Sequence, residues 1–153
     1  VAVLDGKLYA VGGFAAVAAV SDLSSVERYD PATNAWEAVA PMAAERDSPA
    51  VTVLDGKLYA VGGCNDDDGT LFSLERYDPA TNAWEAVAPM ATARQAPAVA
   101  VLEGKLYAVG GYNNDDSFLS SVERYDPATN AWEAVAPMGT ARCFHGIAVL
   151  EVD

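Results

Sequence analysis

"ERYDPATNAWEAVAPM" occupies residues 27–42, and the same sixteen letters return at residues 75–90 and 123–138. A second repeated stretch, "VLDGKLYAVGG", begins at Val3 and Val53, and "VLEGKLYAVGG" begins at Val101. These starting points lie 50 and 48 residues apart, a period typical of repeat architectures. "AVLE" at Ala148 begins a further copy. The sequence therefore predicts three repeats, at about 1–48, 49–96 and 97–145, followed by a partial strand at 146–153.

Each repeat contains four short runs in which apolar and polar residues alternate, the pattern of half-buried β-strands. In the second repeat the predicted strands are Ala50–Leu54, Lys57–Val61, Ser73–Tyr77 and Ala83–Ala88. "DG" at residues 55–56 predicts a type I′ hairpin, and "DPATN" predicts a turn capped by its Asp and Asn side chains. No segment has a helical period. The chain is therefore predicted to be all-β, built from antiparallel four-stranded meanders.

Three features of the repeat resemble the kelch motif. A diglycine closes the second strand of each unit, at Gly12-Gly13, Gly62-Gly63 and Gly110-Gly111. The third strand carries a tyrosine and the fourth a tryptophan: Tyr29, Tyr77 and Tyr125, then Trp36, Trp84 and Trp132. The resemblance covers essentially the whole chain and implies that each repeat is one blade of a β-propeller, similar to the kelch domains of BTB-kelch adaptors. In such a blade the glycines let backbones approach closely, while Tyr and Trp supply apolar area between sheets.

Three blades do not close a ring, and an open arc exposes an apolar face at each end. Because the last residues re-enter the first strand of a further repeat, we expect two chains to share a strand at each junction. The predicted assembly is a C2 homodimer that forms one six-bladed propeller. Two alternatives stay open, a lone arc that aggregates and a four-bladed monomer.

The repeats differ mainly in two kinds of segment. The loops between the second and third strands begin at Phe14, Cys64 and Tyr112, and the links between blades begin at Ala43, Ala91 and Gly139. In an up-and-down meander both kinds of segment lie on the same rim. Loops on a rigid frame commonly carry recognition, so the predicted function is a non-enzymatic binding or scaffold protein that presents variable loops around a central channel.

Natural repeats normally drift apart, whereas these are identical over sixteen residues. Either a recent internal duplication or consensus design explains this identity, and the alanine-rich filler favours design. We therefore interpret the chain as a consensus-designed, self-assembling half-propeller. The alternative interpretation is a natural-type kelch module that recognises acidic peptides.

The chain has 153 residues and a formal net charge of −13. This charge argues against nucleic acid and anionic membranes as partners, because the electrostatic term would be repulsive. No membrane-spanning segment and no secretion signal is visible, so a cytoplasmic location is expected, or recombinant expression if the chain is designed. The two cysteines, Cys64 and Cys143, are predicted to be free thiols in a reducing compartment. No cofactor and no metal is expected.

An arginine follows the last methionine of each repeat by four residues, at Arg46, Arg94 and Arg142. The resemblance to kelch adaptors implies that these arginines face the channel mouth and bind an acidic peptide or a small anion. The alternative is that each arginine pairs with backbone carbonyls or a neighbouring Asp and binds nothing.

The same resemblance implies that the residues after each diglycine line the pocket; these are Phe14, Cys64 and Tyr112. The residues that follow the arginines complete the predicted ligand site, together with one histidine: Asp47, Gln95, Cys143 and His145. Asp47 weakens the acidic-peptide prediction, because its charge offsets the positive potential.

Three further patterns in the sequence could have either a structural or a functional role. The acidic runs at 65–68 and 113–116 are predicted to be solvated loop tips, since they lack the spacing of a calcium loop. The apolar run Phe14–Val20 either binds an apolar partner, folds over the channel or packs at the dimer junction. Cys143 and His145 provide a nucleophile and a base for a weak enzyme, although the sequence specifies no carboxylate partner and no oxyanion hole.

Overall fold

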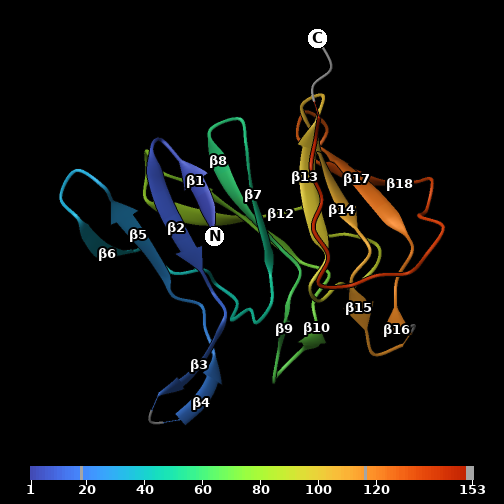
Figure 1. The fold of residues 1–153 in the computed structure, drawn as a ribbon, viewed down its shortest axis with the longest axis horizontal. Helices are drawn as coiled ribbons and strands as arrows, with labels where there is room; N and C mark the ends of the chain where they lie inside the picture. Colours follow the sequence, from blue (N-terminus) through green and yellow to red (C-terminus); the bar gives the residue numbers. More distant parts are fainter. Residues whose placement is uncertain (18, 116, 151–153) are drawn as a thin grey trace.

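The computed structural model describes residues 1–17, 19–115 and 117–150 and consists of three four-stranded antiparallel sheets arranged as successive blades (Figure 1). Blade one contains β1 (Ala2–Leu4), β2 (Lys7–Val11), β5 (Val26–Asp30) and β6 (Ala35–Val39). Blade two contains β7 (Ala50–Leu54), β8 (Lys57–Val61), β11 (Leu74–Asp78) and β12 (Ala83–Val87). Blade three contains β13 (Ala98–Leu102), β14 (Lys105–Val109), β17 (Val122–Asp126) and β18 (Ala131–Val135). The all-β prediction is confirmed, and the four strands predicted for the second repeat agree to within one residue at each end.

The predicted turns form for the expected stereochemical reason. Asp55 and Gly56 both have positive φ, 51° and 70°, as a type I′ hairpin requires. In the next turn the Asp78 carboxylate accepts a hydrogen bond from the Ala80 amide at 2.9 Å. Asn82 has φ of 50°, and its Oδ1 accepts a hydrogen bond from the Tyr77 hydroxyl at 2.9 Å. These short-range contacts fix the register of each blade.

The variable segments after each diglycine are short β-ribbons. They pair β3 (Phe14–Val17) with β4 (Ala19–Asp22), β9 (Cys64–Asn65) with β10 (Gly69–Thr70), and β15 (Tyr112–Asn113) with β16 (Ser117–Phe118). All three ribbons extend from the same end of the blades (Figure 1), which we call the loop rim. The prediction that the variable second-to-third segments share one rim is confirmed, although the sequence predicted loops there rather than ribbons.

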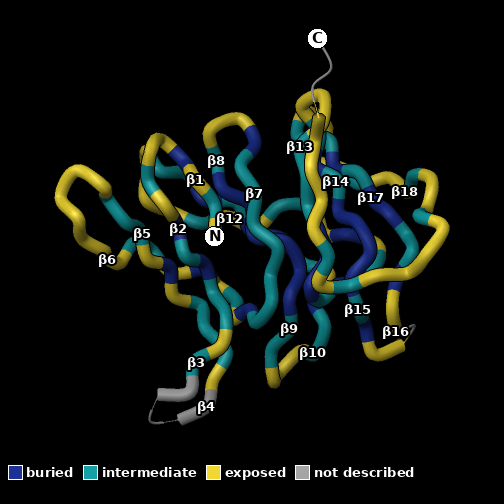
Figure 2. The backbone as a smooth tube through the Cα atoms, viewed as in Figure 1, coloured by how far each residue is buried: buried dark blue, intermediate teal, exposed yellow. Residues whose placement is uncertain are grey.

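The core lies between blades, where the face of one sheet packs on the next. One cluster joins blades one and two through Tyr9, Val26, Leu58 and Tyr77, and a second cluster joins blades two and three in the same way. Buried residues therefore follow β8 and β14, while most turns are exposed (Figure 2). The first strands β1, β7 and β13 are neighbours in succession. The predicted role of the Tyr and Trp positions in packing between sheets is confirmed, since Trp84 and Trp132 pack against these two clusters.

The first glycine of each pair stands where two backbones meet. Gly62 has φ of 62°, and a Cβ added to it would lie 2.2 Å from the Arg94 carbonyl oxygen. A side chain cannot be accommodated there without moving the backbone of the next link. The diglycine is thus required by close approach as well as by backbone conformation.

The C-terminal segment differs from its prediction. Residues 146–150 form no strand in the single chain, and 151–153 lie outside the described residues. A strand needs a partner backbone, and no neighbouring strand pairs with 146–150. Residues 147–150 lie beside β13 and β14, with which they line a hollow of about 310 Å³.

Replacing Gly62 with alanine is expected to lower the free energy of unfolding by about 3 kcal/mol or more, because strain at positive φ adds to a backbone clash. Gly56→Ala is the matched control, since Gly56 also has positive φ (70°) but has no atom within 4 Å of its added Cβ. We expect it to lose about 1 kcal/mol. Urea denaturation at one protein concentration measures both changes, and equal losses would contradict the close-approach argument.

Candidate functional site

Arg46 joins blade one to blade two. Its amide donates to the Leu23 carbonyl at 3.0 Å, and its carbonyl accepts from the Gly13 amide at 2.8 Å, so its backbone belongs to blade one. Its guanidinium group lies in blade two, where Nη1 donates to the carbonyls of Gly62 at 2.8 Å and Ser73 at 3.0 Å. Nη2 donates to Ser73 Oγ and to a Glu75 carboxylate oxygen, both at 3.0 Å. We call this arrangement of Arg46 with Gly62, Ser73 and Glu75 the arginine clasp.

The arginine clasp is repeated between blades two and three. Arg94 Nη1 donates to the carbonyls of Gly110 at 2.7 Å and Ser121 at 2.9 Å. Its Nη2 donates to Ser121 Oγ at 2.9 Å and to the Glu123 carboxylate at 3.0 Å. The Nη1 and Nη2 atoms therefore have the same kinds of acceptor in the two joints, 48 residues apart, while Nε donates to the carboxylate only at Arg94, at 3.3 Å.

Arg46 and Arg94 are 0% exposed, so the predicted role of these two arginines as ligand donors at the channel mouth is wrong. Burial lowers the pKa of both guanidinium groups, and the hydrogen bond and charge of Glu75 or Glu123 oppose that shift. The alternative interpretation, pairing with backbone carbonyls, describes both residues, although the carboxylate partner is a glutamate and not the aspartate it named. Arg142 is exposed at the end of blade three.

Sequence reasoning did not identify Glu75 and Glu123 as partners of the arginines. Both carboxylates are buried, and each also accepts hydrogen bonds from two backbone amides of the preceding link; for Glu75 these come from Ala43 at 2.7 Å and Ala44 at 3.1 Å. One signal was available, because this glutamate is the first residue of the sixteen-residue constant stretch. A buried carboxylate and a buried guanidinium must be matched, so both positions stay constant together.

Four residues of the predicted pocket meet on the loop rim as two pairs. Asp47 and Cys64 exchange backbone hydrogen bonds of 2.8 and 2.9 Å, and Gln95 and Tyr112 exchange two of 2.8 Å. The corresponding members of the third pair, Phe14 and Cys143, lie at opposite ends of the arc. Phe14 is exposed and Cys143 is half-buried. The structure thus brings together the central part of the predicted site and leaves its two ends apart.

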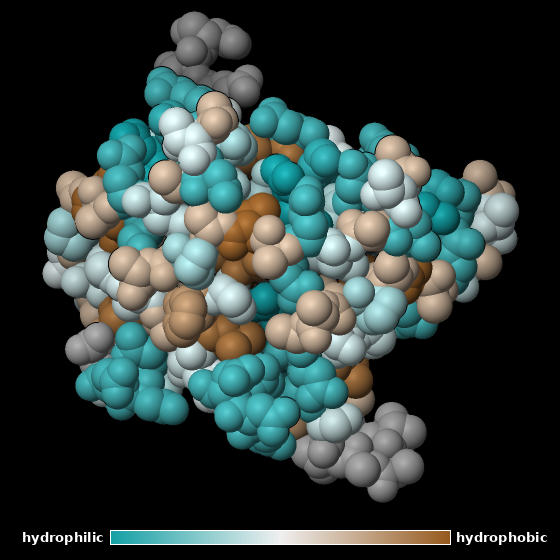
Figure 3. Space-filling view, turned by 180° about the vertical axis from the view of Figure 1, so that it is seen from behind, coloured by the Kyte–Doolittle hydropathy of each residue, from teal (hydrophilic) through white to brown (hydrophobic). Residues whose placement is uncertain are grey.

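The loop rim is acidic where these pairs lie. Burial raises the pKa of the Cys64 thiol, and the nearby charges of Asp47, Asp22 and Asp66 raise it further. Burial and the charge of Asp66 also raise the pKa of the Asp22 carboxyl. Hydrophilic side chains cover this rim around β9–β10 and β15–β16 (Figure 3). The local potential is therefore negative, which opposes the predicted binding of an acidic peptide.

Cys143 and His145, the predicted nucleophile and base, lie near each other in sequence after blade three. The structure places no hydrogen bond between Cys143 and His145 within its described residues, and both ring nitrogens of His145 are buried without a partner. Burial and the charge of Arg142 lower the pKa of this histidine. Over the same described ranges, no group of three or more His, Cys, Asp or Glu residues could hold a metal ion. Asp116, the last residue of the acidic run 113–116, lies outside the described residues. The side chains of residues 16–20, in the apolar run Phe14–Val20, are not described either.

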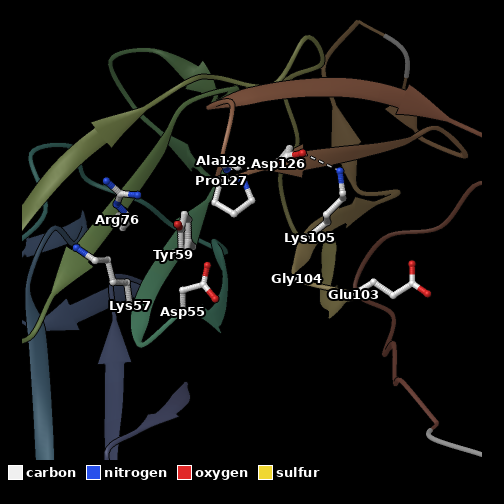
Figure 4. A pocket seen from close by; sticks show the side chains of 10 residues that line it. All are labelled: Asp55, Lys57, Tyr59, Arg76, Glu103, Gly104, Lys105, Asp126, Pro127 and Ala128. Atoms are coloured by element: carbon white, nitrogen blue, oxygen red, sulfur yellow. Dashed lines mark hydrogen bonds and ion pairs between the residues drawn. The ribbon is translucent and has the colours of Figure 1, made fainter.

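A hollow of about 440 Å³ lies on the opposite rim between blades two and three (Figure 4). Both lysines that line it are paired, Lys105 with Asp126 at 2.7 Å across its wall and Lys57 with Asp78 at 2.7 Å, and the carboxylates of Asp55 and Glu103 also line it. A hydrogen bond to Tyr59, and then one to Glu85, raise the pKa of Arg76, which also lines it. All of its residues except Asp55 and Glu103 have an identical counterpart in both other repeats, and these two differ only as Asp and Glu, so the hollow is a feature of the scaffold.

Glu75→Gln is expected to lower the free energy of unfolding by about 3 kcal/mol or more, because it leaves the buried Arg46 charge without its carboxylate. Glu85→Gln is the matched control. Glu85 pairs with Arg76 on the surface, where such a pair contributes about 1 kcal/mol or less. Urea denaturation of both variants measures the difference, and similar small losses in the two variants would show that the arginine clasp does not hold the blades together.

In a Cys143→Ser background, the rate at which iodoacetamide alkylates Cys64 is expected to rise with pH around a midpoint above that of a free cysteine. A raised pKa means that the reactive thiolate forms only at higher pH. Asp47→Asn is expected to lower the midpoint and to accelerate the reaction at pH 7 a few-fold, since one of the opposing charges is removed. Asp67→Asn, in the same ribbon, is the control that leaves the rate unchanged. A midpoint at the value for free cysteine would contradict the acidic rim.

Comparisons with known proteins agree with this geometry. The kelch motif model matches residues 1–43, 45–91 and 93–139, one match for each blade. Kelch-like protein 35 from Mus musculus is 50% identical over 48 residues, and the human protein of the same name is 50% identical over 50 residues. These alignments cover 31% and 33% of this chain but only 8% of each relative.

The solved structure of YjhT aligns with a TM-score of 0.78 at 20% identity. The alignment covers 92% of this chain and 52% of that one, so this chain spans about half of its length. At this identity the likeness shows the shared fold. Within the part of the chain that the structure describes, no helix is long and apolar enough to cross a membrane. With one motif match on each of three four-stranded blades, the chain belongs to the kelch-repeat family.

Proposed function

We propose that this chain is a non-enzymatic kelch scaffold that forms half of a six-bladed propeller, closes with a second copy as a C2 ring, and presents its three ribbons for recognition. Kelch repeats build propeller modules that bind other molecules or serve as scaffolds, and this chain has three of them. The proposal adds the second copy and the use of the loop rim.

One observation carries the closure, namely the exposure of blade one. Leu58 and Leu106 are 0% exposed, because each lies under the preceding blade, whereas Leu8 at the same repeat position is 37% exposed. Trp36 is likewise 50% exposed, while its counterpart Trp84 donates to the Ala40 carbonyl of the preceding blade at 2.9 Å. An exposed face of this kind in an otherwise packed repeat marks an interaction site. Its exposed apolar side chains, Leu8 and Trp36, are those that the preceding blade covers elsewhere in the chain, so the face fits the end of another blade.

The opposite end of the arc supports the same closure. The third cluster contains only three buried residues, Ala98, Val109 and Val122, where each of the other two contains eight. Residues 147–150, "IAVL", lie beside this face and repeat the sequence "VAVL" of residues 1–4 with one change. We propose that this segment pairs with the first blade of the second copy, so that a strand is shared at each junction.

Recognition is proposed for the ribbons of the loop rim, because they differ between blades while the frame is constant. The acidic environment of Cys64 favours a partner that presents neutral or cationic groups there. Identical repeats of sixteen residues also support the interpretation that the chain is a consensus design. An acidic-peptide site is not part of the proposal, since its two central arginines are buried in the arginine clasps.

Light scattering after size exclusion, over a dilution series, tests the closure. We expect a mass of twice the 16.0 kDa chain without a tail of larger species. Leu8→Asp is expected to give a monomer, because it places a carboxylate on the face to be covered. The matched control is Phe72→Ser, at an exposed position where the other two repeats have serine, and it should keep the dimer mass. A monomeric wild type, or a ladder of larger species, would overturn the proposal.

A further inference from the structure

Arg142 is held in the same way as the two arginines that join blades. Its amide donates to the Leu119 carbonyl at 3.0 Å, and its carbonyl accepts from the Gly111 amide at 2.7 Å. The corresponding distances are 3.0 and 2.8 Å at Arg46 and 2.9 Å for both bonds at Arg94. The backbone of Arg142 is therefore already in the conformation that carries an arginine clasp. Only the blade that would receive its guanidinium group is missing from the single chain.

Glu27 shows the reverse situation at the other end of the arc. It occupies the position of Glu75 and Glu123, which are 4% exposed, yet Glu27 is exposed because no blade precedes it. The acceptors around it are formed as in the other blades. The Gly12 amide donates to the Ser25 carbonyl at 3.0 Å, and the corresponding bonds in blades two and three are 3.1 Å. Blade one thus presents a complete receiving site for a guanidinium group.

We infer that Arg142 of one copy enters blade one of the second copy and pairs there with the Glu27 carboxylate. By the pattern of the arginine clasp, Nη1 would donate to the carbonyls of Gly12 and Ser25, and Nη2 to Ser25 Oγ and Glu27. This inference rests on the proposed ring of two chains and names the residues that hold its two junctions. Over the described residues, neither Arg142 nor Glu27 forms an ion pair within its own chain.

Further groups at the two ends match in the same register. At the joint between blades one and two, Asn82 Oδ1 accepts from the Ala40 amide at 3.0 Å, and Trp84 donates to the Ala40 carbonyl. The same positions at the two ends of the arc are Asn34 and Trp36 in blade one and Ala136 after blade three. The amides of Gly139 and Thr140 correspond to those of Ala43 and Ala44 that bind Glu75. The junction therefore repeats an interface that the chain already forms twice.

The charges make the junction directional. An end with Glu27 fits an end with Arg142, whereas two ends of the same kind would bury like charges without a partner. Apolar area alone would not distinguish these pairings. The ion pair therefore favours the packing of blade three of one copy on blade one of the other copy. Two such junctions close one ring.

The test compares Arg142→Ala and Glu27→Ala with wild type by measuring the dimer dissociation constant. Each single variant leaves one buried charge unpaired at both junctions, so we expect dimerisation to weaken about a hundred-fold or more. Circular dichroism checks that both chains remain folded. Arg76→Ala is the matched control, since Arg76 pairs with Glu85 within blade two, away from both ends of the arc, and should change the constant by a few-fold at most.

Mixing the two variants provides the sharper measurement. A heterodimer of Arg142→Ala with Glu27→Ala has one intact ion pair at one junction and neither charge at the other. No charge is then buried alone, so the mixed species is expected to form in preference to either homodimer. Native mass spectrometry with one chain isotopically labelled quantifies the three species.

The outcomes separate this inference from the proposal beneath it. A wild type that stays monomeric overturns both. A dimeric wild type whose dissociation constant is unchanged by Arg142→Ala and Glu27→Ala overturns the ion pair and leaves the ring standing. A statistical mixture of the three species likewise contradicts the pairing of Arg142 with Glu27.

Discussion

Each blade of this protein is joined to the next by an arginine whose backbone belongs to one blade and whose guanidinium group lies inside the other. A buried cation is stable only with several acceptors, and Arg46 finds two carbonyls, a hydroxyl and a carboxylate in blade two. The close approach at Gly62 and the apolar cluster between the sheets form around the same joint. The residues that form this joint, an arginine, a glycine, a serine and a glutamate, are therefore constant in all three repeats.

A structure whose cohesion lies between repeats is incomplete at its ends. Leu8, Trp36 and Glu27 are exposed where their counterparts in blades two and three are covered, and Arg142 extends beyond blade three with no acceptor blade beside it. In solenoid proteins, polar capping repeats remove such ends. In the proposed ring, these two ends are complementary halves of one interface, and a second copy would cover both. The proposed self-association would use the same kinds of contact that join the blades within the chain.

Because two of the arginines are buried in the joints between blades, they are not accessible for binding a partner. The resemblance to kelch adaptors implies that arginines offer their guanidinium groups at the channel mouth. Arg46 and Arg94 instead use these groups inside the fold. What differs from blade to blade, and is accessible, is the set of ribbons on the loop rim. Burial, and then the charges of neighbouring carboxylates, raise the pKa of Asp22 and Cys64 there. A partner docking there meets an acidic surface on a rigid frame.

The sequence by itself determined the strands, the turns, the blade count and the variable rim, because alternation, the Asp-Gly hairpins and the repeat period are local properties of the chain. It also assigned Asp47 and Cys64 to the same rim, and the structure then showed that their backbones pair. The roles of the arginines were decided only by the tertiary structure. The acceptors of Arg46 come from Gly62, Ser73 and Glu75, at distances of 16, 27 and 29 residues along the chain. Whether a guanidinium group faces a channel or a neighbouring blade depends on where those distant acceptors lie after packing, and no local pattern encodes that position.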